Sequence, residues 1–337
     1  MISETPNQAA RREKKVVTVT LNPSLDRTLT THFLSLGYHN RTTETTRLDP
    51  AGRGVDVSRA LHSLGVPTHA IILVGHDATG RAYQALLTEE QFPITILRRE
   101  GRTRSNISIL DTGHNNQTVI LEECGELTRA DRQAVANALI ELIEPGDTVV
   151  FAGSLPPGAR NDTYALLTSL AEAKGAAVAV NAGGGEPLLM ALRARPRLLY
   201  LTQTQAEGLF NFPVRAYEDV LYCARQLQEQ GATRVLIAME KPQGAFLVAE
   251  TGAWMATWPE ISGTRSGRAE ALIAGYLAAQ FQQRPFDEAL KLGAAAAAYT
   301  VSQVGHEFGT MRDIEECMAQ VTVVSTDSLA DNPDAQA

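Results

Sequence analysis

Short apolar runs alternate along the chain with longer stretches in which apolar residues recur every three to four positions. The runs that read as buried strands are residues 16–21, 70–74, 148–151, 177–180, 198–201 and 235–239. Alternation of buried strands with amphipathic helices is typical of βαβ units. The pattern therefore predicts an α/β fold with a doubly wound, mostly parallel sheet that carries helices on both faces.

Two segments have a more polar pattern. Residues 27–47 are rich in Thr, and residues 106–110 and 118–122 flank the turn-like sequence Asp-Thr-Gly-His-Asn-Asn at 111–116. Half-polar runs around such a turn are typical of antiparallel strands with one exposed face. We expect segments 27–47 and 103–122 to form a small antiparallel β lid on the main domain; a peripheral hairpin without a role is the alternative.

Composition limits what the chain binds. The 337 residues are 44% hydrophobic, and the polar segments 1–15 and 323–337 read as flexible tails around a domain at 16–322. The net charge of −8 argues against a nucleic-acid polymer as partner, because such binding requires a basic surface. No apolar run reaches the roughly 20 residues of a membrane helix, and the N-terminus lacks a signal core. We expect a cytoplasmic protein with no membrane partner.

The three cysteines carry no site of their own. Cys124, Cys223 and Cys317 lie far apart and are odd in number, without the paired spacing of a zinc site or a disulfide framework. We expect them to be reduced packing residues.

Polar side chains follow the first predicted strand. Asp26 ends the sequence Asn-Pro-Ser-Leu-Asp, where the carboxyl end of a strand meets the crevice that binds ligands in open α/β sheets. Its carboxylate either accepts hydrogen bonds from sugar hydroxyls or caps a turn. Next, Ala-Gly-Arg-Gly-Val-Asp at 51–56 leads into an amphipathic helix. Gly52 lets a ligand approach the backbone, and Arg53 offers paired donors to a phosphate beside the N–H groups of the helix start.

Two further segments belong to the same crevice. Thr-Arg-Ser-Asn at 103–106 opens a predicted strand, and Arg104 faces either a ligand phosphate or solvent. Gly-Ser-Leu-Pro-Pro-Gly at 153–158 leaves a buried strand through a turn fixed by two prolines, so we expect it to shape the crevice rather than to react.

The order of these motifs resembles the phosphofructokinase B branch of the ribokinase-like carbohydrate kinases, over residues 16–322. Asn-Pro-x-x-Asp, Gly-x-Gly-x-x-Val, Thr-Arg-x-Asn and Gly-Ser-Leu-Pro-Pro-Gly follow one another as in that family. Similar kinases transfer a phosphoryl group from ATP, with Mg²⁺, to fructose 1-phosphate, fructose 6-phosphate or tagatose 6-phosphate. The resemblance implies a sugar-phosphate site and a nucleotide site. The implied substrate residues are Asp26, Gly52, Arg53, Asp56, Arg104 and Asn106, with the two arginines gripping the phosphate. Similar kinases often dimerise through their lids, and the half-exposed strands are compatible with such a homodimer.

The chain departs from the family on both sides of the implied site. Asp56 replaces an asparagine, which adds negative charge beside a phosphorylated sugar. The family's Lys-Pro-Asn-x-x-Glu corresponds to 202–207, where only Glu207 is retained; the resemblance implies that Glu207 organises magnesium through water and that Thr204 lies at the nucleotide. The family's adenine loop, Leu-Gly-x-x-Gly-Ala, corresponds loosely to 239–245, where Glu240 stands in place of the first glycine; the resemblance implies that Met239 and Gly244 lie at the nucleotide.

The largest departure lies before the apolar helix at 271–276. Similar kinases read Gly-Ala-Gly-Asp there, and this chain reads Gly-Arg-Ala-Glu at 267–270. The resemblance aligns Glu270 with the aspartate that takes the proton from the attacking hydroxyl, and Gly267, Arg268 and Ala269 with the turn that aims N–H groups at the phosphoryl group. The extra methylene of Glu270 displaces its oxygens by roughly an ångström or more. Ala269 replaces a glycine that positive backbone angles would require, and Arg268 either binds phosphate or fills the pocket. Taken alone, Glu270 is better explained as a helix-start carboxylate than as a base, and the resemblance gives the two interpretations equal weight.

The sequence therefore leaves two candidate functions open. One is an ATP-dependent sugar-phosphate kinase of impaired activity with Glu270 as base; the other is a pseudokinase that binds a sugar phosphate or nucleotide as a sensor or regulatory partner. A dinucleotide-binding oxidoreductase is set aside, because no Gly-x-Gly-x-x-Gly follows the first strand.

Overall fold

The computed structural model describes residues 13–44, 46–240, 243–261, 266–303 and 307–326. Within them, ten strands form the main sheet. From one edge to the other these are β14 (Thr322–Ser325), β13 (Gly252–Thr257), β12 (Gly244–Ala249), β11 (Arg234–Met239), β10 (Leu198–Thr202), β9 (Ala177–Ala182), β8 (Thr148–Gly153), β1 (Val16–Thr20), β4 (Thr68–Gly75) and β5 (Ile94–Arg99). From β11 to β5 every neighbouring pair is parallel, and β12 to β14 add an antiparallel edge. The predicted mostly parallel α/β sheet is confirmed.

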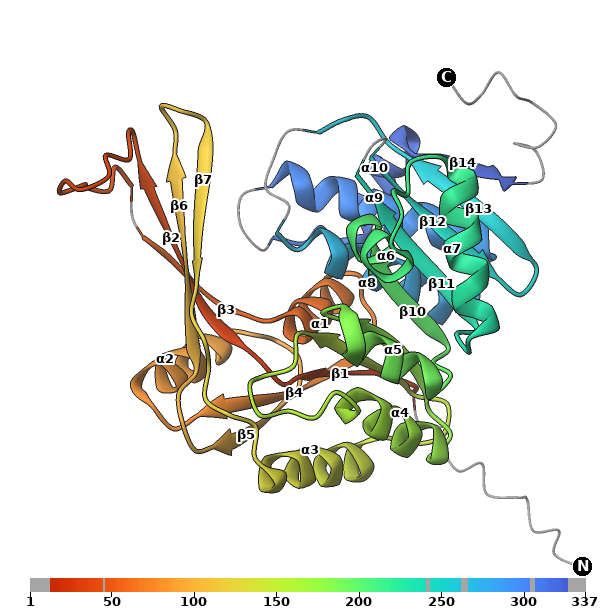
Figure 1. Ribbon diagram of the computed structural model, residues 1–337, viewed down its shortest axis with the longest axis horizontal. Helices are drawn as coiled ribbons and strands as arrows, with labels where there is room; N and C mark the ends of the chain where they lie inside the picture. Colours follow the sequence, from red (N-terminus) through yellow and green to blue (C-terminus); the bar gives the residue numbers. More distant parts are fainter. Residues whose placement is uncertain (1–12, 45, 241–242, 262–265, 304–306, 327–337) are drawn as a thin grey trace, which may run out of the picture.

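Helices cover both faces of this sheet (Figure 1). One face carries α3 (Arg129–Leu142), α4 (Thr163–Ala173), α5 (Gly185–Arg193), α6 (Gln203–Phe210) and α7 (Tyr217–Glu229). The other carries α1 (Arg53–Ser63), α2 (Ala78–Leu87), α8 (Arg268–Phe281), α9 (Phe286–Ser302) and α10 (Met311–Cys317), followed by a 3-10 turn at Met318–Gln320. Side chains from successive strand positions point to opposite faces, so each face has its own apolar core. No helix in the described ranges is both long and apolar enough to cross a membrane.

Two glycines set the distance between α8 and α9. Gly275 and Gly293 face each other, and a Cβ added to Gly275 would lie 2.7 Å from the Cα of Gly293. A side chain at either position would push the helices apart. This close contact holds α8, whose first residues belong to the implied catalytic turn, against the core.

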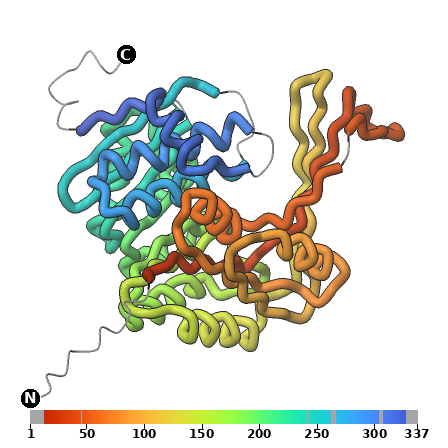
Figure 2. The backbone as a smooth tube through the Cα atoms, turned by 180° about the vertical axis from the view of Figure 1, so that it is seen from behind, coloured from red at the N-terminus to blue at the C-terminus, as the bar shows by residue number. Residues whose placement is uncertain are grey.

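A second, smaller sheet projects from the main one, seen from opposite sides in Figures 1 and 2. It consists of β3 (Arg47–Ala51), β2 (Ser24–Thr31), β6 (Arg104–Asp111) and β7 (Asn116–Leu121), in that order. The outer pairs are antiparallel, as predicted, but β2 and β6 are parallel. The reason is connectivity: β2 follows β1 and β6 follows β5, and both chains leave the same end of a parallel sheet.

The structure corrects the predicted C-terminal boundary. Residues 323–325 belong to β14, which pairs with β13, rather than to a tail. Val323 and Val324 extend the sheet because the edge of β13 offers unpaired backbone groups. Residues 1–12 and 327–337 of the predicted tails lie outside the described residues, as do Lys241, Pro242, Thr264 and Arg265 of the two implied nucleotide-side motifs.

Candidate active site

A cleft of about 330 Å³ lies between the two sheets, where the carboxyl end of β10 meets the starts of α1 and α8. Its lining comprises Ser24, Asp26, Ala51, Gly52, Arg53, Asp56, Arg104, Asn106, Tyr200, Thr202, Glu240, Ser266, Gly267, Arg268, Ala269 and Glu270. The structure thus brings together all the residues predicted for the substrate side and all those predicted for the catalytic turn. Carboxyl ends of parallel strands are the usual place for a ligand in such sheets.

Strand register builds the lid side of the cleft. Asp26 pairs with Asn106 across β2 and β6, and the Asn106 amide Nδ2 donates to Asp26 Oδ1 at 2.9 Å and to Ser24 Oγ at 3.0 Å. Arg104 donates to Asn106 Oδ1 at 3.3 Å. The Asp26 carboxylate and the Arg104 guanidinium are therefore held beside each other, as an acceptor for hydroxyls and a donor for an anion.

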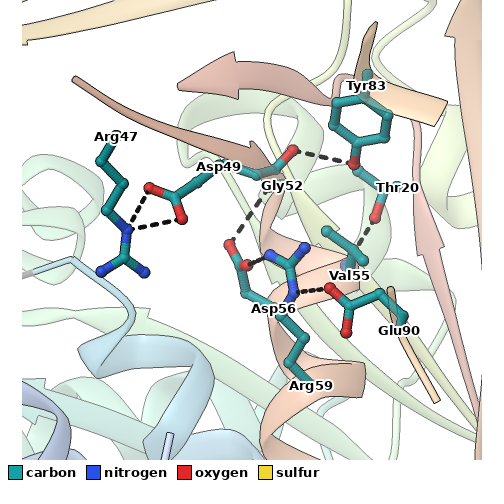
Figure 3. A network of polar contacts seen from close by, with 10 residues as sticks. Thr20, Arg47, Asp49, Gly52, Val55, Asp56, Arg59, Tyr83 and Glu90 are labelled. Carbon is teal, nitrogen blue, oxygen red and sulfur yellow. Dashed lines mark hydrogen bonds and ion pairs between the residues drawn. The ribbon is translucent and has the colours of Figure 1, made fainter. Parts of the chain in front are cut away.

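The Asp56 carboxylate is paired inside the protein, which changes its predicted effect. Its Oδ1 accepts a hydrogen bond from Arg59 at 2.8 Å and its Oδ2 accepts one from the Gly52 N–H at 3.3 Å (Figure 3). Arg59 donates in turn to Glu90 at 2.6 Å. Asp56 is buried, and Arg59 compensates its charge. Its second oxygen holds the Gly52 turn in place.

Arg53 connects the two sides of the cleft. Its Nε lies 3.8 Å from Glu270 Oε1, and its NH1 donates to Asn181 Oδ1 at 3.3 Å. The Arg53 side chain is 45% exposed while that of Glu270 is only 7% exposed. An anion bound by Arg53 would therefore lie next to the carboxylate that is the candidate base.

Helix α8 begins at the cleft. Gly267 is its N-cap residue with φ 77°, a left-handed conformation that favours glycine, and no side chain caps the helix. Ala269, by contrast, lies within the helix and is absent from the positive-φ residues of the described chain. The expectation that position 269 needs a glycine for its backbone angles is wrong. The first N–H groups of α8 have no acceptor within the helix, as at any helix start, so they can face an anion.

Three departures from the family pattern are bonded to one another. Arg268 NH2 donates to Glu240 Oε1 at 3.0 Å, and the Glu240 N–H donates to Gln203 Oε1 at 2.9 Å. These residues come from the starts of α8 and α6 and the end of β11. These linked hydrogen bonds lie on the implied nucleotide side of the cleft. Arg268 is buried and paired with Glu240.

The other residues implied at the nucleotide lie elsewhere. Thr204 is exposed on α6, and Met239 pairs with Gly244 across β11 and β12 in the main sheet. Glu207 Oε1 accepts a hydrogen bond from the Val214 N–H at 3.1 Å. None of the four lines the cleft as the described residues form it.

The fit to the implied cofactors differs between magnesium and nucleotide. Within the described ranges no group of three or more His, Cys, Asp or Glu side chains could hold a metal ion. The residues therefore do not fit a metal held by protein ligands alone. Arg104 Nε and the Tyr200 hydroxyl, both from cleft-lining residues, are buried without a hydrogen-bond partner in the described chain. Unpartnered buried donors beside arginines fit a polar, anionic ligand.

Sequence reasoning missed several cleft residues. Tyr200 was part of the predicted strand at 198–201, and nothing in an apolar run distinguishes its cleft-facing end. Thr202 was noted only as the first residue of the segment that corresponds to Lys-Pro-Asn-x-x-Glu. Ser24 stands between the motif residues Asn22 and Asp26, and Glu240 was noted only as a lost glycine. The available signal was position, since each follows or ends a strand that enters the crevice.

Comparison with known proteins defines the class to which this fold and cleft belong. The model of the pfkB family carbohydrate kinases matches residues 19–312. The chain therefore belongs to the pfkB family of carbohydrate kinases. It is 30% identical over 309 residues to the 1-phosphofructokinase of Bacillus subtilis (strain 168), covering 91% of this chain and 99% of the relative. It is 25% identical over 311 residues to the ATP-dependent 6-phosphofructokinase isozyme 2 of Escherichia coli (strain K12), covering 91% and 99%.

Solved structures agree with this assignment. Phosphofructokinase-2 from Escherichia coli in complex with potassium has a TM-score of 0.84 and 26% identity, covering 91% of this chain and 98% of that one. The same enzyme in complex with fructose-6-phosphate has a TM-score of 0.83 and 26% identity, with coverage of 91% and 98%. The relatives are sugar-phosphate kinases by name, and the ribokinase-like fold expected from the motifs is confirmed.

Proposed function

We propose that this chain transfers the γ-phosphoryl group of ATP to a hydroxyl of a phosphorylated hexose of the fructose 1-phosphate, fructose 6-phosphate or tagatose 6-phosphate type, at a reduced rate. The observation that carries this proposal is the convergence of Glu270 with Asp26, Arg53 and Arg104 on one cleft. A carboxylate base, a hydroxyl acceptor and two guanidinium groups are the parts that such a transfer uses. The names of the relatives support a sugar phosphate as acceptor.

Each residue has a defined task in this proposal. Asp26, held by Asn106, orients a sugar hydroxyl, while Arg104 and Arg53 bind the substrate phosphate through charge-assisted hydrogen bonds. Glu270 takes the proton of the attacking hydroxyl. The N–H groups at the start of α8 face the transferring phosphoryl group. Bound Mg²⁺ would neutralise nucleotide charge.

The reduced rate follows from three features of the site. Glu270 is longer than the aspartate it replaces, and phosphoryl transfer depends chiefly on position. Arg268 is engaged by Glu240, and Glu207 is engaged by the Val214 N–H outside the cleft. These contacts also favour a second candidate, a pseudokinase that binds a sugar phosphate or nucleotide as a sensor or regulatory partner.

One assay separates the two candidates. Purified protein is incubated with ATP, Mg²⁺ and each hexose phosphate, and ADP formation and the melting temperature are measured for wild type and Glu270→Gln. Slow turnover that Glu270→Gln abolishes, with sugar binding retained, supports the kinase. Equal inactivity with a ligand-induced rise in melting temperature supports the pseudokinase. Wild-type turnover at roughly 1 to 1,000 per second would contradict the reduced rate. A wild type that shows no turnover and binds no ligand would contradict both candidates.

We also propose a homodimer through the small sheet. Val119, Ile120 and Leu121 of β7 are at least half exposed, at 51%, 50% and 67%, and β7 ends the described sheet. An exposed apolar edge strand readily pairs with a second copy. Light scattering should give a dimer for wild type and a monomer for Ile120→Lys; a monomeric wild type contradicts the proposal. A cytoplasmic location stays a prediction.

A further inference from the structure

Tyr200 differs from the other large buried tyrosines. Tyr83, Tyr164, Tyr200 and Tyr276 all have side chains that are almost wholly inaccessible. The Tyr83 hydroxyl donates to the Ala51 carbonyl at 3.2 Å, Tyr164 donates to the Gly153 carbonyl at 3.0 Å, and Tyr276 accepts from Arg234 at 3.3 Å. The Tyr200 hydroxyl has no hydrogen-bond partner in the described chain, although the residue is 1% exposed.

An unpartnered buried hydroxyl is unfavourable for the protein alone. Burying a hydroxyl without a hydrogen bond leaves the desolvation cost of the group uncompensated, and native proteins satisfy nearly all such groups. Tyr200 lines the cleft together with Glu270, Arg268 and Arg53. A ligand in the cleft is therefore the available partner for this hydroxyl.

The surroundings determine what kind of atom the hydroxyl would bind. Burial, followed by the nearby Glu270 carboxylate, raises the pKa of Tyr200 far above its ordinary value, so the hydroxyl keeps its proton and can donate. Arg268 and Arg53 also act on this hydroxyl electrostatically, and Glu240 does so to a smaller extent. A neutral donor that lines one cleft with the guanidinium groups of Arg53, Arg104 and Arg268 can bind an anionic oxygen together with them.

We propose that Tyr200 is a ligand-binding residue whose hydroxyl donates a hydrogen bond to a phosphate oxygen of the phosphoryl donor. The phosphoryl donor is favoured over the sugar phosphate because the charges that act most on Tyr200 are Glu270 and Arg268, at the start of α8, whereas Arg104 and Asn106 come from the small sheet. The inference rests on the proposed function, namely that the cleft binds a nucleotide beside a sugar phosphate.

The test compares Tyr200→Phe with Tyr276→Phe, which removes a partnered hydroxyl whose neighbour, Arg234, is not among the cleft residues. The probes are the non-hydrolysable analogue adenylyl imidodiphosphate with Mg²⁺ and, separately, fructose 6-phosphate, both followed by calorimetry. We expect Tyr200→Phe to weaken binding of the analogue about tenfold or more and to leave the affinity for fructose 6-phosphate unchanged. The reason is that the variant loses only the charge-assisted hydrogen bond to the phosphoryl donor. Tyr276→Phe should change neither affinity.

Stability of the ligand-free protein is a second readout. Tyr200→Phe should melt no lower than wild type, since no bond is removed, while Tyr276→Phe should melt lower. Equal affinity of wild type and Tyr200→Phe for the analogue would overturn the inference, as would a loss of ligand-free stability equal to that of Tyr276→Phe. A wild type that binds no nucleotide would instead overturn the proposed kinase function at the first measurement, and the inference with it.

Discussion

Arg268 and Glu240 form an ion pair within the cleft, with Arg268 NH2 3.0 Å from Glu240 Oε1. Each stands where the family motif that this sequence resembles has a small residue, and the two lie 28 positions apart. The added cation and the added anion compensate each other, and Gln203 holds the backbone of Glu240. The departures at the nucleotide side thus act as one unit, and their effects should not add independently.

Glu240→Gln should strengthen nucleotide binding severalfold. Glu240 competes with a phosphate for the Arg268 guanidinium and adds negative charge to the cleft, and the glutamine keeps the shape without the charge. Calorimetry with adenylyl imidodiphosphate and Mg²⁺ measures the change. In an Arg268→Ala background the same substitution should have a smaller effect; weaker binding by Glu240→Gln alone would show that Glu240 positions Arg268 for the nucleotide.

Restoring the family sequence should raise turnover. The variant carries Arg268→Ala, Ala269→Gly and Glu270→Asp together with Glu240→Gly, so that no carboxylate loses its partner. The variant restores an aspartate as the base and removes the Arg268 and Glu240 side chains from the turn. We expect the rate of ADP formation to rise about tenfold or more. The same triple change without Glu240→Gly should gain less. No gain, in a variant that folds and binds both ligands, would place the main defect at 202–204.

Asp56→Asn should destabilise the protein by about 1 to 3 kcal/mol. The substitution leaves the mostly buried Arg59 with Glu90 alone, and breaking a buried pair exposes the desolvation cost of the remaining charge. Urea unfolding measures the free energy. Asp162→Asn is the matched control, because its partner Arg160 is 68% exposed, and it should change stability by less than about 0.5 kcal/mol. Equal losses would contradict a structural role for the Asp56 pair.

Gly275→Ala and Gly208→Ala should have opposite effects. A Cβ at Gly275 would meet the Gly293 Cα at 2.7 Å, so α8 and α9 must separate, at a cost of about 2 kcal/mol or more. Gly208 lies in α6 with nothing within 4 Å of an added Cβ, and alanine there should stabilise by about 0.5 to 1 kcal/mol. Both are measured by urea unfolding; a neutral Gly275→Ala would show that the helix contact adjusts.

Cys223 should resist alkylation at pH 8. Burial, with a smaller effect of Asp219, raises the pKa of its thiol to about 11 from an ordinary 9.0. The folded state favours the neutral thiol, so this contribution to stability is present below pH 9.0 and is lost as the pH rises through about 11. Iodoacetamide labelling and peptide mapping should find the partly buried Cys317 modified before Cys223. Equal rates in the folded protein would contradict the burial of Cys223.

The sequence by itself determined the class of fold and the substrate side of the cleft. Apolar runs at 16–21 and 198–201 match β1 and β10 because strand periodicity is a local property. Asp26, Arg53 and Arg104 follow strand ends or begin a helix or strand, and the carboxyl ends of parallel strands meet at one edge of a sheet. Their arrival in one cleft could therefore be predicted without coordinates.

Only the tertiary structure decided the charges and partners within that cleft. The pairing of Asp56 with Arg59, the contact of Arg268 with Glu240 and the unpartnered hydroxyl of Tyr200 depend on which side chains meet after folding. Glu207 likewise retains its place in the motif while its carboxylate is bound by the Val214 N–H. A sequence motif specifies which groups are available, but hydrogen bonding and burial, which set their chemistry, arise from packing between segments distant along the chain.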